Sequence, residues 1–236
     1  NPGVSHIIGV WLERGSPYAR SLAFMLTKTI RRPEHLEALK NFALGQGGPD
    51  DMRYQAAIEA AKEKLIGKRV SLWLQGKQQE IILMAYEFHD EITEIHTEEV
   101  DNLLVKSIDR LNEAREAEDQ VEAAPIYQEV EDILNQALAL DPEAPDLRNN
   151  LAACYHSQGK LDEAIAILDQ VIEDAPHYVH ARTSRAKLYI GAEDIDAAKD
   201  LLLPMLEWDR FHFDDFSEFS DAYVACLMAQ DQEEGA

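Results

Sequence analysis

Residues 145–178 decide the fold of the C-terminal half of the chain, and they read PDLRNNLAACYHSQGKLDEAIAILDQVIEDAPHY. Apolar residues recur at helical spacing on both sides of Gly159, which supplies a tight turn. The small residues Ala152 and Ala164 stand in the first and second of these segments, and Pro176 ends the second. Because small side chains let helices approach closely, the stretch predicts an antiparallel pair of tightly packed helices.

The pattern recurs with a period of 34 residues. In the first pair the small, aromatic, small and large positions hold Ala152, Tyr155, Ala164 and Leu168. One period later they hold Ala186, Tyr189, Ala198 and Leu202, which match in type. A second period reaches Ser220 and Tyr223, and one period back from Pro176 lies Pro142. Arg210 stands where the next Pro would fall, which predicts an irregular exit from the second helix pair.

This pattern extends over residues 111–230 and resembles the tetratricopeptide repeat, whose helix pairs carry small, aromatic and Pro residues at these places. The resemblance implies an α-solenoid of stacked helix pairs. Two more helices are predicted before the full repeats, one over 125–140 and a long one from Thr97. The inward face of the long helix is expected to hold Val100, Leu103, Leu104, Ile108 and Leu111.

The resemblance also implies a function. Proteins with tetratricopeptide repeats are usually scaffolds and adaptors, and the first helix of each pair lines a concave groove that holds a peptide or a partner helix. The corresponding positions here, called the groove residues below, are Asp146, Asn149, Asn150, Ala153, His156, Ser157, His180, Thr183, Lys187, Ile190 and Gly191. Some members clamp a terminal carboxylate with Lys, Asn and Arg, but this sequence supplies only Asn149 and Lys187 of such a set.

Composition limits the classes of partner. The 236 residues include 22 Lys+Arg and 45 Asp+Glu, a net charge of −23, and 46% are hydrophobic, which is typical of a packed globular protein. So acidic a surface repels phosphate, which argues against nucleic acid and favours a basic or amphipathic protein partner. No apolar stretch approaches the ~18 residues of a membrane-spanning helix, so we expect a cytoplasmic protein without membrane contact.

Charge is divided unevenly along the chain. Residues 1–68 carry ten basic and seven acidic side chains, whereas residues 69–236 carry twelve and thirty-eight. Such asymmetry favours separate structural units. We predict a helical unit over 1–68, a β-hairpin connector over 69–96, and the repeat array with a C-terminal capping helix over 97–236.

The first unit is predicted to contain four short helices. Apolar residues of helical spacing fill 4–14, and Pro17, Pro33 and Pro49 mark the starts of three further helices. The short loops between them favour stacked antiparallel pairs, as in a bundle or an α-solenoid. These helices resemble paired helical repeats of the HEAT type.

After residue 68 the hydrophobic period changes from helical to alternating. Apolar residues alternate over 70–75, and a second β-rich run covers 80–88, with a turn at Gly76 between them. An isolated hairpin is marginally stable, so this one should pack on a helical face, with Ile92 and Ile95 as candidates for a third strand. The alternative is an exposed edge that accepts a partner strand.

Residues suited to metal binding do not form a motif. His177 and His180 would share a helix face with Glu173, but Pro176 breaks the helix between them. The acid- and His-rich segment 89–96 is interpreted as a solvated turn, the alternative being a site that joins a histidine to carboxylates.

Catalytic motifs are not found either. Cys154 and Cys226 are interpreted as core residues. The glycines at 45–48 lack the Lys-Ser/Thr of a phosphate-binding loop, and no Gly-x-Ser-x-Gly motif occurs. The sequence therefore predicts no catalytic residue, no metal site and no cofactor.

Aromatic residues crowd the C-terminal segment among acidic ones: Trp208, Phe211, Phe213, Phe216 and Phe219. The simplest interpretation is a cap that packs over the last repeat and is kept soluble by its acids. The alternative is an acidic-aromatic contact surface for a basic partner.

Together these features predict a mainly α protein that acts as a protein–protein interaction scaffold and not as an enzyme. The alternative is a regulatory or sensor region of a larger enzyme or defence protein, with the catalytic part outside this sequence. A start at Asn1, without Met or a leader-like stretch, is consistent with such a fragment. The oligomeric state stays open.

Overall fold

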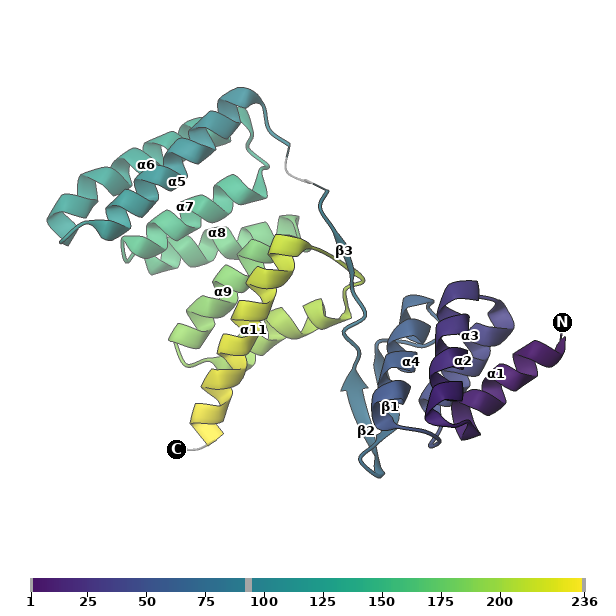
Figure 1. Ribbon diagram of the computed structural model, residues 1–236. Coiled ribbons are helices and arrows are strands. Elements are labelled where there is room, and N and C mark those ends of the chain that lie inside the picture. The colour runs from purple at the N-terminus through teal and green to yellow at the C-terminus, as the bar shows by residue number, and fades with distance from the viewer. Residues whose placement is uncertain (1, 92–94, 235–236) are drawn as a thin grey trace. The chain divides into compact units, whose positions relative to one another are not determined.

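The computed structural model describes residues 2–91 and 95–234, which form two compact units (Figure 1). The first unit contains the chain up to Glu87 together with Leu206–Arg210. The second contains Phe88–Met205 and the residues from Phe211 onward. Within the described residues, no helix is both long enough and apolar enough to cross a membrane.

The first unit begins with four helices, α1 (Pro2–Arg14), α2 (Pro17–Ile30), α3 (Pro33–Leu44) and α4 (Asp50–Lys62). The starts predicted at Pro17 and Pro33 are confirmed, because Pro is tolerated at the first helical position, where the N–H has no partner. The hydroxyl of Ser16 caps α2 by accepting from Ala19 N at 3.3 Å. Helix α1 packs on α2 and α3, and α3 packs on α4. The resemblance to HEAT repeats stays a prediction.

The predicted hairpin is confirmed: β1 (Arg69–Leu74) pairs antiparallel with β2 (Lys77–Ile82). The second strand is shorter than the run expected over 80–88, since the chain turns where Ala85 N donates to Leu83 O at 2.9 Å.

The hairpin shares its core with the four helices. Leu72 and Leu83 are fully buried in the same cluster as Leu39 and Phe42 of α3. The structure therefore groups the hairpin with the first unit, which differs from the separate connector expected over 69–96.

A third strand forms with a different partner from the one expected. The short β3 (Glu87–His89) pairs with β4 (Arg210–His212), and not with the hairpin. Of the two residues suggested for this strand, Ile95 is 83% exposed, and Ile92 lies outside the described residues.

The segment Leu206–Arg210 packs on the first unit although it follows the repeats in sequence. Lys68 Nζ lies 3.4 Å from Asp209 Oδ1, and the hydroxyl of Tyr86 donates to Leu206 O at 3.2 Å. The backbone N–H of Glu87 donates to Asp209 O at 2.8 Å. These contacts explain why the chain leaves the second unit here before it returns at Phe211.

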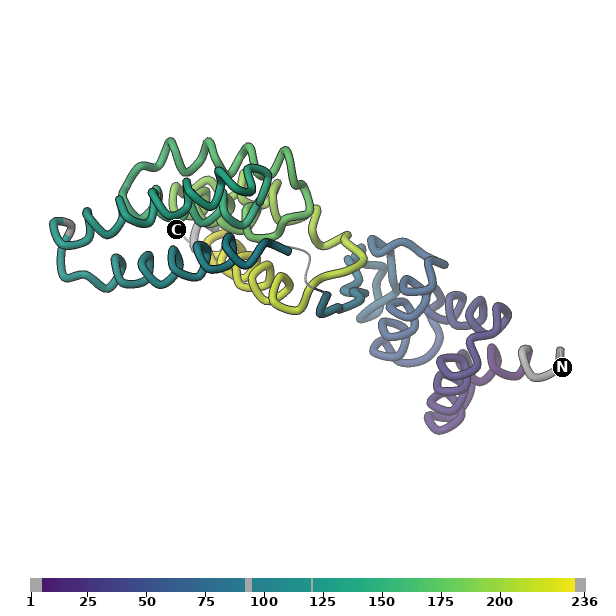
Figure 2. Tube along the Cα trace, turned by 90° about the horizontal axis from the view of Figure 1, so that it is seen from above, coloured from purple at the N-terminus to yellow at the C-terminus, as the bar shows by residue number. Residues whose placement is uncertain are grey.

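The second unit is a series of helices, α5 (Glu98–Glu116), α6 (Gln120–Leu140), α7 (Pro145–Ser157), α8 (Leu161–Asp174), α9 (Val179–Gly191), α10 (Ile195–Leu202) and α11 (Phe213–Glu234). The pairs α5/α6, α7/α8 and α9/α10 each pack internally. In addition, α6 packs on α7, α8 on α9, and α10 on α11, as expected of a solenoid. Figure 2 shows α5 and α6 running side by side.

Two side-chain caps set the start of this array. The hydroxyl of Thr97 accepts from Val100 N at 3.4 Å, and the carboxylate of Asp119 accepts from two N–H groups of α6 at 2.9 Å. The start of α6 predicted at Pro125 was therefore too late, because the Asp119 cap lets the helix run through the Pro. Ile108, expected to face inward, is 40% exposed.

The small residues of the repeat pattern are buried as predicted. Ala152, Ala164, Ala186 and Ala198 are all at most 1% exposed. The irregular exit is also confirmed, since α10 ends at Leu202 and is followed by the 3-10 turn η1 (Leu203–Glu207) and then by β4.

Some of the C-terminal aromatic residues are buried and others are exposed. Phe211 and Phe219 are buried and stacked, with ring centroids 5.5 Å apart, as a packed cap requires. Phe213 is 70% exposed, and Trp208 belongs to the first unit.

Candidate functional site

The groove residues lie on α7 and α9, the first helices of two successive pairs. Helix α7 contacts α5 on one side and α9 on the other, and α9 contacts α11. The helices α5, α7, α9 and α11 therefore form one series of neighbours, called the first-helix row below (Figure 1). The structure thus brings the groove residues of both repeats onto adjacent helices of this row.

On α7, His156 is exposed, and Asn149, Asn150, Ala153 and Ser157 are partly buried. Asn150 Nδ2 donates within its own helix, to Asp146 O at 2.8 Å. Ser157 Oγ accepts from Arg115 Nε of α5 at 3.3 Å. Two of the groove residues are thus engaged by the protein itself.

Two buried oxygen atoms of α7 accept no hydrogen bond from the described residues. They are Oδ1 of Asp146 and Oδ1 of Asn149. Because the two residues are three positions apart on a helix, they share one face. A buried acceptor without a hydrogen bond costs about 1–3 kcal/mol, so both oxygens are unfavourable for the folded protein as it stands.

His96 fixes the neighbouring end of α7. Its Nδ1 lies 3.0 Å from Asp141 Oδ2 and its Nε2 lies 2.9 Å from Asp146 Oδ2, while the side chain is 5% exposed. Carboxylates only accept, so a ring that donates through both nitrogens must be protonated. Burial opposes that charge, but the hydrogen bonds to Asp146 and Asp141 outweigh it and raise the pKa of His96.

We expect the contribution of His96 to stability to depend on pH. A histidine whose pKa is raised by folding stabilises most below its unfolded pKa of about 6.5, and this stabilisation is lost as the pH rises through the folded value. His96→Ala should therefore cost about 1–3 kcal/mol at pH 6 and less at pH 9, measured by urea denaturation. His156→Ala, an exposed change on α7, is the control and should show no such trend. An equal cost of His96→Ala at both pH values would contradict this account.

On α9, the groove residues face the last helix. Lys187 Nζ lies 2.6 Å from Glu218 Oε1, Thr183 Oγ1 lies 3.3 Å from the same oxygen, and His180 Nε2 lies 3.4 Å from Asp215 Oδ1. Burial opposes the charge of Glu218, but the hydrogen bond and attraction of Lys187 outweigh it, so the pKa of Glu218 is lowered. Polar groups of the second repeat are thus paired with α11, whereas in the first repeat Oδ1 of Asp146 and Oδ1 of Asn149 have no donor among the described residues.

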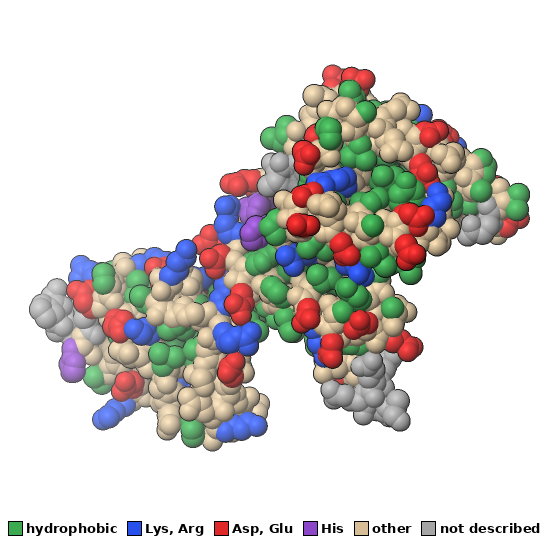
Figure 3. All heavy atoms as spheres, turned by 180° about the vertical axis from the view of Figure 1, so that it is seen from behind, with side chains coloured by type: hydrophobic (Ala, Val, Ile, Leu, Met, Phe, Trp, Pro, Cys, Tyr) green, Lys and Arg blue, Asp and Glu red, His purple; other side chains and the backbone are tan. Residues whose placement is uncertain are grey.

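Among the remaining groove residues, Ile190 is partly buried and Gly191 is exposed. Acidic side chains are spread over the visible face of the second unit, with apolar side chains between them (Figure 3). A partner that meets this unit therefore encounters negative charge beside apolar surface.

Three features of this region could not be found from the repeat pattern. His96 stands in a segment that was interpreted as a solvated turn, and its partners are 45 and 50 residues away. Arg115 is not one of the positions that the repeat pattern singles out. Asp215 and Glu218 belong to the acidic-aromatic segment, and its sequence gives no indication that they pair with groove residues of α9.

The residues that were considered for catalysis or metal binding have surroundings typical of a structural role. Cys154 is fully buried, and burial raises the pKa of its thiol, which disfavours the reactive thiolate. His180 is partnered by Asp215. Among the side chains that the structure describes, no three His, Cys, Asp or Glu are placed to hold a metal ion.

Stacked helix pairs with buried small residues at a fixed period define a helical-repeat protein. The profile of the tetratricopeptide-repeat family matches residues 114–179 and 156–219. Residues 114–219 therefore consist of tetratricopeptide repeats, a fold that serves as a scaffold for protein interactions. Among solved structures it is similar to a thermophilic tetratricopeptide-repeat protein from Thermus thermophilus, with 19% identity and a TM-score of 0.47, covering 87% of this chain and 90% of that one.

Proposed function

We propose that the second unit binds a basic or amphipathic peptide or helix of another cytoplasmic protein along the first-helix row. The contacts would come from the groove residues Asn149, Asn150, Ala153, His156, Ser157, His180, Lys187 and Ile190, whereas Thr183 is fully buried and would act by holding Glu218. In this role the protein acts by binding and carries out no reaction.

The observation that carries the proposal is the pair of unpartnered acceptors on α7. Oδ1 of Asp146 and Oδ1 of Asn149 are buried and receive no hydrogen bond from the described residues. Donors on a bound chain, either backbone N–H groups or Lys and Arg, would satisfy both once the side chains that cover these oxygens move aside. The acidic composition of the chain supports the same class of partner.

The test compares two variants that make the same change in different places. Asn149→Leu removes the unpartnered acceptor, whereas Asn135→Leu changes an exposed residue of α6. Proteins retained from a cell extract should be quantified by mass spectrometry for the wild type and for both variants. We expect Asn149→Leu to reduce the retained partner about tenfold, as for the loss of a buried hydrogen bond of about 1.4 kcal/mol, and Asn135→Leu to retain it.

Salt provides a second measure of the same complex. If the acidic surface contributes, raising the salt concentration should weaken the retained complex, because exposed charges are screened. Equal retention by Asn149→Leu and Asn135→Leu would show that the partner does not use α7.

A further inference from the structure

The first helix pair carries a second hollow surface, lined by none of the groove residues. A depression of about 720 Å³ lies between α5 and α6. Its walls come from Glu99, Leu103 and Lys106 of α5 and from Gln136, Ala139 and Leu140 of α6. We call it the α5–α6 seam.

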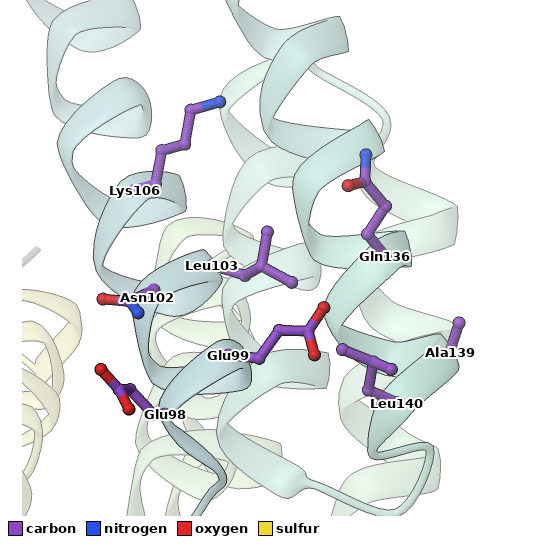
Figure 4. A pocket seen from close by; sticks show the side chains of 8 residues that line it. All are labelled: Glu98, Glu99, Asn102, Leu103, Lys106, Gln136, Ala139 and Leu140. Atoms are coloured by element: carbon purple, nitrogen blue, oxygen red, sulfur yellow. The ribbon is translucent and has the colours of Figure 1, made fainter.

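Figure 4 shows how these side chains are arranged. Leu103 and Glu99 point from α5 towards α6, and Leu140 points back towards α5, so that two leucines form an apolar centre with a carboxylate beside it. Leu140 is 52% exposed. Apolar surface of this kind is expected to be covered when a partner is present.

The packing of the array indicates what shape would cover it. In each later step, the second helix of one pair packs on the first helix of the next: α6 on α7, α8 on α9, and α10 on α11. Helix α5 is also the first helix of a pair, yet in the described part of the chain its main contacts are with α6 and α7 only. If the same packing applied to α5, one more helix would pack on the side of α5 that faces away from α7.

The charges indicate the chemistry of that helix. Lys106 is already paired, with its Nζ 3.5 Å from Glu129 Oε1. Glu99 forms no ion pair with any residue that the structure describes. A basic side chain on an incoming helix would therefore complement Glu99, while its apolar face would cover Leu103 and Leu140.

We propose that the α5–α6 seam binds an amphipathic helix of a partner protein, with apolar residues one turn apart and a Lys or Arg placed next to Glu99. The lining of this surface includes no residue of α7 or α9, so its occupant need not be the partner of the groove residues.

The test uses a defined probe and two matched pairs of variants. The probe is a synthetic, fluorescently labelled helical peptide of about 18 residues, or five turns, made of Leu, Ala and Lys with the Leu on one face. Leu140→Gln is matched by Leu161→Gln, since these leucines are 52% and 46% exposed at helix ends. Glu99→Gln is matched by Glu163→Gln, an exposed residue of α8. Binding is measured by fluorescence anisotropy.

We expect Leu140→Gln to weaken binding about tenfold and Glu99→Gln about threefold at low salt, with little change in either control. All four changes affect exposed residues, so the variants should remain folded. Equal losses in a variant and its control would overturn the proposal, because they would show binding without a specific site.

Two further outcomes would also overturn it. If Asn149→Leu weakens the probe while Leu140→Gln does not, the peptide lies on the first-helix row. If sedimentation shows dimers that Leu140→Gln dissociates, the seam is covered by a second copy of this chain and not by a partner helix.

Discussion

Replacing Arg53 with Met is expected to destabilise the first unit by about 3–5 kcal/mol, the cost of removing one member of a buried charged network. Arg53 is 1% exposed, although it is charged. Its Nη2 donates to Trp73 O at 2.7 Å and its Nη1 donates to Gly47 O at 2.9 Å. It also pairs with Asp50 of the same helix. Through Gly47 and Trp73, Arg53 thus joins the loop before α4 to the first strand of the hairpin.

The cost arises because Met fills the space but donates no hydrogen bond. The carbonyl groups of Trp73 and Gly47 would then be left buried without donors. Arg53→Lys should also fail to restore stability, since a single ammonium group cannot reach the several acceptors that a guanidinium spans.

The measurement is urea denaturation followed by tryptophan fluorescence. All three tryptophans, Trp11, Trp73 and Trp208, belong to the first unit, so the signal reports on that unit alone. Arg32→Met is the control, because Arg32 is exposed and makes no side-chain cap on α3. It should change the stability by about 0.5 kcal/mol or less. A similarly small change in stability for Arg53→Met would show that these hydrogen bonds do not stabilise the first unit.

Replacing Ala164 with Leu is expected to destabilise the repeat array by about 3 kcal/mol, the upper part of the usual range for overpacking a filled core. Ala164 is fully buried and shares its cluster with Ala152, Leu168 and Ala181, which come from α7, α8 and α9. A larger side chain must therefore separate these helices or adopt a strained rotamer.

The matched control is Ala166→Leu, the same change on the exposed side of the same helix. It should alter the free energy of unfolding by about 0.5 kcal/mol or less. Both variants are measured by urea denaturation followed by circular dichroism at the helix band. If they were equally stable, the period of small residues would have no role in helix packing.

The second unit could be predicted from sequence because its signal is repeated and local. Ala152 and Ala186 occupy equivalent places, so each supports the interpretation of the other, and both are buried. Helix starts at Pro17 and Pro33 could be predicted for a similar reason, since the chemistry lies at the position itself. The start of α6 was missed because the cap at Asp119 competes with the stronger Pro125 signal.

Contacts between distant segments could not be predicted in the same way. The pairing of His96 with Asp141 and Asp146 depends on where the loop before α5 meets α7. The return of Leu206–Arg210 to the first unit depends on contacts with Lys68 and Tyr86, far away in sequence. Neither contact produces a periodic pattern in the sequence, because each involves single residues in irregular segments.

Hydrogen–deuterium exchange of the wild-type protein with its captured partner tests the central claim most directly. Binding along the first-helix row should slow exchange in α7 and α9, over residues 145–157 and 179–191. Slower exchange confined to the helices and hairpin of the first unit, with α7 and α9 unchanged, would contradict the claim.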